Sequence, residues 1–162
     1  MDPEGLLTTA AEISIAIAGF SGIVVAVAPG HLAELPTAAK SILSTLLLVT
    51  ASTFAYAFVP LLILSADVQE ESAWPVSSLL HTIYLVTVIA YRMNQSRRTS
   101  RDDRPSGSFY LFPVFVATAL TLQVVNMLWL HAAWPYLVAI VVMNLSGFFV
   151  FSILMWGFVS AA

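Results

Sequence analysis

The sequence predicts an all-α integral membrane protein: a single domain over residues 1–162, built as a bundle of five transmembrane helices. Three observations predict this fold class. First, 59% of the 162 residues are hydrophobic and only 9% are charged, whereas a soluble domain carries about 25% charged residues. Second, the apolar residues gather in five runs of the length that crosses a bilayer. Third, the basic residues are confined to the loops of one side, which predicts an N-terminus outside and a cytoplasmic C-terminus.

Each of the five runs is close to the ~20 residues that cross a ~30 Å hydrocarbon core. Because backbone polar groups in lipid must bond within their own element, each run is expected to be an α-helix. The expected helices cover about 6–28, 39–64, 76–93, 109–130 and 135–158.

The fourth and fifth runs are separated only by "HAAWP". A continuous helix from 109 to 158 would be roughly 75 Å long, so the sequence predicts a tight antiparallel hairpin instead. The tripeptide "AWP" occurs twice, ending at Pro75 and Pro135. Proline suits the first turn of a helix, so both are expected to mark helix starts. Pro60 and Pro113 are expected to kink their helices.

The orientation follows from the six basic residues. They lie in the first loop, at Lys40, and in or beside the polar third loop over 94–108, which reads "NQSRRTSRDDRPSGS". Alternating helices place these two loops on one side, and an excess of Lys and Arg marks the cytoplasmic side. The N-terminus and the second loop carry acidic residues and no basic residue. We therefore expect these two segments outside.

The first run, "TTAAEISIAIAGFSGIVVAVA", contains an acid, Glu12. Beside it, Ser14, Ala18 and Gly22 follow the small-xxx-small spacing that lets helix backbones approach closely. These three residues are the expected helix-packing positions. An ionisable residue within a membrane span is by default a candidate for function.

The other runs also carry polar residues at similar depth, at ~6–12 Å below the outer ends of their helices. They are Tyr56, His81, Gln123 and Asn126. If these faces point inward, Glu12 and these four residues form a polar cluster that can bind a proton or a cation, because a carboxylate in a low dielectric needs a compensating charge or donor. Two other interpretations stay open for Glu12: a position at the outer membrane interface, and a hydrogen-bonded structural role.

Several classes of function are disfavoured by residues that are missing. The chain has no cysteine, which excludes disulfides and thiolate chemistry. It has no paired-carboxylate motif, no histidine cluster with metal spacing, no nucleophile elbow and no phosphate-binding loop. The few basic residues argue against nucleic-acid binding. We therefore expect neither an enzyme nor a cofactor or metal protein.

The stretches "AEISIAIAGFSGIVVAV" and "WPYLVAIVVMNLSGFFVF" resemble a group of small, uncharacterised bacterial polytopic membrane proteins, in which an acid-bearing, Ala/Gly-rich first helix precedes several further spans. The resemblance implies a bacterial cytoplasmic (inner) membrane and carries no assigned activity.

Two functions are consistent with these patterns. One is a small channel or transporter for protons or cations, formed as a homo-oligomer because five short helices enclose little volume for a pore. The alternative is a non-catalytic structural or assembly subunit that packs against a partner membrane protein. Both place the chain in the lipid bilayer.

Overall fold

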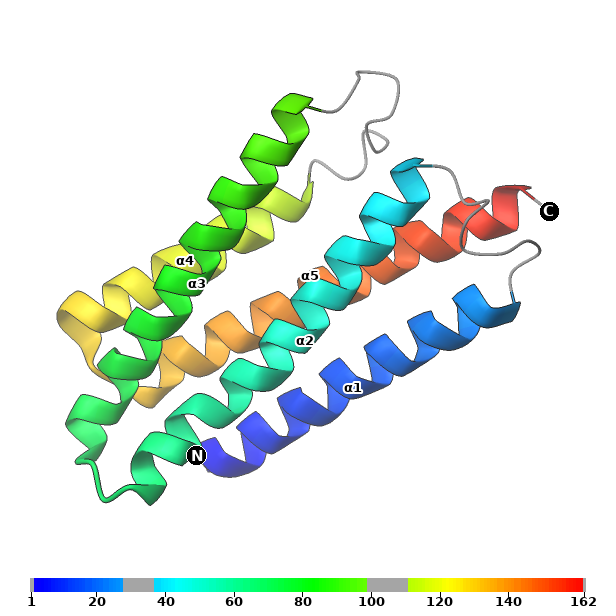
Figure 1. Cartoon of the computed structure of the whole chain (residues 1–162). Coiled ribbons are helices and arrows are strands. Elements are labelled where there is room, and N and C mark those ends of the chain that lie inside the picture. Colours follow the sequence, from blue (N-terminus) through cyan, green and yellow to red (C-terminus); the bar gives the residue numbers. More distant parts are fainter. Residues whose placement is uncertain (1, 28–36, 99–110, 162) are drawn as a thin grey trace.

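The computed structural model describes residues 2–27, 37–98 and 111–161, which form helices and no strand (Figure 1). The elements are α1 (Pro3–Val27), α2 (Thr37–Ser65), α3 (Glu70–Arg98), α4 (Phe112–Val125), the π-helical segment η4 (Asn126–Leu130) and α5 (Ala133–Ala161).

Five helical segments are long and apolar enough to cross a membrane: α1, α2, α3, α4 continued by η4, and α5. Helices α2, α3 and α5 each have 29 residues, which corresponds to roughly 43 Å and exceeds a ~30 Å hydrocarbon core. The all-α prediction with five candidate spans is confirmed.

The third helix differs most from its expected bounds of 76–93. It begins at Glu70 and ends at Arg98, so Pro75 lies inside it and does not mark its start. Its first turn forms because the N–H groups of Ser72 and Ala73 donate to Gln69 O. At the other end, residues 94–98 of the expected polar loop are helical, and the remainder of that loop lies outside the described residues.

The other proline expectations give mixed results. Pro135 lies in the first turn of α5, as the second "AWP" predicts. Pro113 also lies in the first turn of its helix, α4, so the expectation of a kink there is wrong. Pro60 lies within α2.

The predicted hairpin between the fourth and fifth spans is confirmed. Only His131 and Ala132 separate η4 from α5, and His131 has a left-handed backbone with φ 46°. Asn126 organises this turn. Its carbonyl accepts from His131 N at 3.0 Å, and its side-chain Oδ1 accepts from Ala132 N at 3.0 Å.

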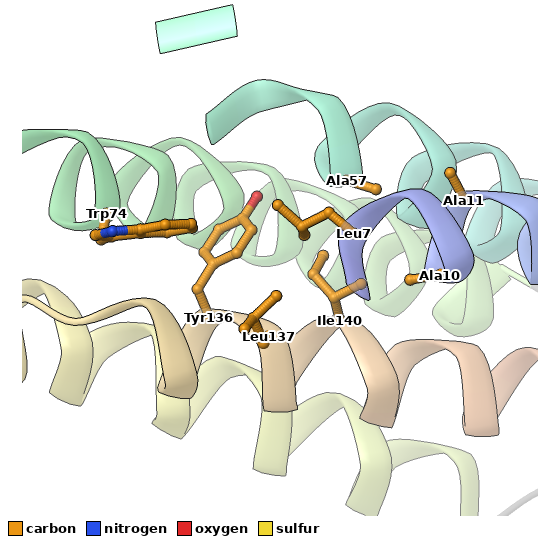
Figure 2. Packing of buried hydrophobic residues seen from close by; sticks show 8 residues of the cluster. All are labelled: Leu7, Ala10, Ala11, Ala57, Trp74, Tyr136, Leu137 and Ile140. Carbon is orange, nitrogen blue, oxygen red and sulfur yellow. The ribbon is translucent and has the colours of Figure 1, made fainter. Parts of the chain in front are cut away.

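The helices pack in two groups. Helix α1 contacts α2 and α5, and α5 also contacts α4, while α3 packs on α2 and on α4 with η4. Figure 1 shows α1 at one edge of the bundle, on the far side of α2 and α5 from α3 and α4. The apolar core near the N-terminal ends of α1 and α5 is drawn in Figure 2, where Tyr136 rises from α5 beside Trp74 and Leu7.

Candidate functional site

Helices α1 and α5 are joined by a buried polar contact near the middle of the bundle. Ser14 Oγ donates to Asn144 Oδ1 at 2.8 Å, and Asn144 Nδ2 donates to the carbonyl of Ala10 at 3.1 Å. Asn144 lies ~4.5 Å from the midpoint of α5 along its axis. This contact fixes the height of the Ala10–Ser14 segment of α1.

Glu12 lies between those two residues, so it is level with Asn144. It is exposed, as are Thr8, Ala16 and Gly19 on the same face of α1, and this face lies opposite the buried one. With a core of ~30 Å centred on the helix, Glu12 is ~10 Å from the nearer surface of the hydrocarbon. The carboxylate therefore faces away from its own bundle.

The expected packing stripe is only partly packed. Ser14 is 1% exposed, Ala18 is half-buried, and Gly22 is exposed; beyond the adjacent helix backbone, no atom of the described residues lies within 4 Å of where its Cβ would be. The physical reason is geometric: each step of four residues turns about 40° beyond a full helical turn, so the stripe leaves the interface. The face that packs consists of Leu7, Ala10, Ala11, Ser14, Ile17 and Ser21.

A second polar cluster lies between α3 and α4. Gln123 Nε2 and His81 Nδ1 are 2.8 Å apart, and both side chains have 0% exposure. The ring of Tyr56 from α2 stacks on the His81 ring with centroids 4.6 Å apart and an interplanar angle of 18°. Three of the sequence-predicted residues are therefore brought together.

Asn126 lies about one turn beyond Gln123 and contributes to the same helix interface. Its Nδ2 donates to Ser78 Oγ on α3 at 2.9 Å, while its Oδ1 accepts from Ala132 N at 3.0 Å. Both ends of this amide are engaged in holding the hairpin against α3.

The backbone carbonyl of Tyr56 makes a hydrogen bond that was not predicted from the sequence. Pro60, four residues later, has no N–H to donate to the Tyr56 carbonyl. The hydroxyl of Tyr136 on α5 donates to that carbonyl at 2.6 Å, which replaces the missing helical hydrogen bond. Pro60 was the feature of the sequence that could have predicted this contact, because a proline within a helix leaves the carbonyl four residues earlier without its helical N–H donor.

Glu12 does not join this cluster. Its helix packs on α2 and α5, whereas His81, Gln123 and Asn126 lie on α3, α4 and η4. Three buried residues that were not among the candidate site residues bond to predicted ones: Ser78 to Asn126, Tyr136 to the Tyr56 carbonyl, and Asn144 to Ser14.

Within the described parts of the chain, no three His, Cys, Asp or Glu side chains are grouped so that they can hold a metal ion. Comparisons of the chain with protein family models, curated proteins and solved structures find no match. The function of this chain must therefore be inferred from its own sequence and geometry.

Proposed function

We propose that the chain is a subunit of an oligomeric, multi-pass protein of a bacterial cytoplasmic membrane, with its N-terminus outside, that transports protons or cations by binding them at Glu12 between subunits. The observation that supports this proposal is the position of Glu12. It lies in an apolar helix, ~4.5 Å from its midpoint, and is exposed on the face opposite the packed one.

A charged side chain at the centre of a bilayer costs ~2.5–3.5 kcal/mol on insertion scales. A bound proton or cation removes this cost, and both can be exchanged. The face around Glu12 is suited to a neighbouring subunit, because a Cβ at Gly19 would meet no atom of the described residues within 4 Å beyond the adjacent helix backbone, and small residues allow close helix approach.

The test is ion flux through purified protein in proteoliposomes under an imposed proton or cation gradient. The Glu12→Gln variant keeps the size of the side chain and removes its charge, and it is expected to lower the flux at least ~10-fold, the effect of ~1.4 kcal/mol on a barrier. Glu4→Gln is the matched control, because it removes the same charge from the same helix ~12 Å closer to its N-terminus. Wild-type protein that conducts neither protons nor cations under any gradient would refute the proposal.

A second candidate function is a non-catalytic assembly subunit. It is supported by the interior polar contacts, because Ser14–Asn144, Asn126–Ser78 and Tyr136–Tyr56 connect helices to one another. In this case Glu12 would contact a partner protein.

The two candidates are separated by purification from native membranes in mild detergent. A stoichiometric partner favours the assembly subunit, and a homo-oligomer favours the ion-binding protein. Gly19→Leu is expected to disrupt either association, since it places a bulky side chain on the Glu12 face. Ala117→Leu adds the same side chain to an exposed position of α4 and serves as the control that leaves the association intact.

A further inference from the structure

We infer that the buried His81–Gln123 pair is an internal hydration site, where water binds between α3 and α4. Both side chains of the pair have a polar atom with no hydrogen-bond partner among the described residues, His81 Nε2 and Gln123 Oε1, and the same is true of Thr82 Oγ1, next to His81 in the sequence. His81 and Gln123 have 0% exposure, so neither lipid headgroups nor a second chain can reach them in this arrangement.

The deficit does not depend on the orientation of the Gln123 amide. With Nε2 donating to His81 Nδ1, the remaining groups are a ring N–H donor and a carbonyl acceptor. With the amide reversed, Oε1 accepts from Nδ1–H, and an amide NH₂ and a ring nitrogen acceptor remain. Either way, one atom of each side chain needs a partner.

The neighbouring polar side chains are already engaged. Tyr136 donates to the Tyr56 carbonyl, and the Tyr56 hydroxyl is 3.3 Å from Leu80 O. Asn126 bonds Ser78 and Ala132. Because unsatisfied polar groups inside hydrocarbon are costly, and because buried polar groups without a protein partner are commonly bonded by internal water, water is the partner that fits.

The hydroxyl of Thr82, the residue after His81 on α3, is also buried and has no hydrogen-bond partner among the described residues. Hydration of the His81–Gln123 pair does not involve Glu12, so it can be tested independently of the proposed ion binding.

The experiment is water-edited solid-state NMR of the full chain in lipid bilayers, with ¹⁵N-labelled histidine. A His31→Gln, His131→Gln background leaves His81 as the only signal, and the wild-type protein provides exposed His131 as the positive control. Magnetisation is expected to pass from water to the His81 ring. Its absence at mixing times that saturate His131 would overturn the inference.

Gln123→Leu tests whether the pair itself holds the water. Leucine fills a similar volume and offers no hydrogen bond, so the rate of transfer to His81 is expected to fall several-fold. An unchanged rate in a folded Gln123→Leu protein would also overturn the inference. If that variant does not fold, the measurement on His81 with Gln123 intact still decides the question.

Discussion

We expect the hydrogen bond from the Tyr136 hydroxyl to the Tyr56 carbonyl of α2 to contribute measurably to the free energy of unfolding. Pro60 leaves that carbonyl without its helical donor, and the Tyr136 hydroxyl is 2.6 Å from it. In Tyr136→Phe, the partly buried carbonyl loses its partner at almost unchanged side-chain volume. An unsatisfied buried group costs ~1–3 kcal/mol, and hydrogen bonds between membrane helices are measured at ~0.6–2 kcal/mol, so we expect a loss of ~1–2 kcal/mol.

The same substitution should cost much less when residue 60 can donate. In Pro60→Ala, the new N–H bonds the Tyr56 carbonyl, so Tyr136→Phe is expected to cost less than ~0.5 kcal/mol there, close to the error of additivity. The packing that Pro60 loses on becoming alanine cancels in the double-mutant cycle. The coupling energy of the pair should therefore be ~0.5–2 kcal/mol.

The assay is reversible unfolding of the four proteins in mixed micelles with increasing denaturing detergent, followed by helical circular dichroism. Tyr91→Phe removes a hydroxyl from an exposed tyrosine and provides the baseline for this type of substitution. Equal costs of Tyr136→Phe with proline and with alanine at position 60 would refute the compensation argument.

Two further predictions concern the buried amides. Asn144→Leu removes the Ser14–Asn144 and Asn144–Ala10 hydrogen bonds between α5 and α1, so it should lower the free energy of unfolding by ~1–3 kcal/mol. Ser14→Ala removes only one of the two and should cost less. An equal loss in the two variants, in the same unfolding assay, would contradict this arrangement. Asn126→Ala removes the hydrogen bonds to Ser78 and to the Ala132 N–H, so it should destabilise the protein by ~1–3 kcal/mol. The effect, measured as a shift in thermal unfolding in detergent, should exceed that of Ser78→Ala. A larger effect of Ser78→Ala would count against the structural role of the amide.

The candidate site shows where reasoning from the sequence reaches its limit. Position along each helix predicts Glu12, His81 and Gln123 at similar depths, but depth along a helix says nothing about which neighbour a face meets. The structure groups His81 with Gln123 and Tyr56, and it leaves Glu12 on the opposite side of α1 from the packed face.

The stripe of small residues illustrates the same limit. Small-xxx-small spacing indicates where a backbone can approach closely. At Gly22, however, no other helix among the described residues comes within 4 Å of the Cβ position, while Ile17, a bulky residue, is only 8% exposed. The rotation of α1 about its own axis is set by its contacts with residues of α2 and α5, which are distant from α1 in the sequence.

The sequence by itself determined that the chain is helical and apolar enough to cross a bilayer five times, because hydrophobic length and backbone hydrogen bonding in lipid are local properties. It also determined the tight hairpin before α5, since no single helix of that length fits a bilayer. Only the tertiary structure decided that Tyr136 completes the hydrogen bond Pro60 cannot make, that two atoms of the His81–Gln123 pair lack a partner among the described residues, and that Glu12 faces away from its own bundle. Each depends on the rotation and stagger of helices relative to one another, which are set by packing between residues far apart in the chain.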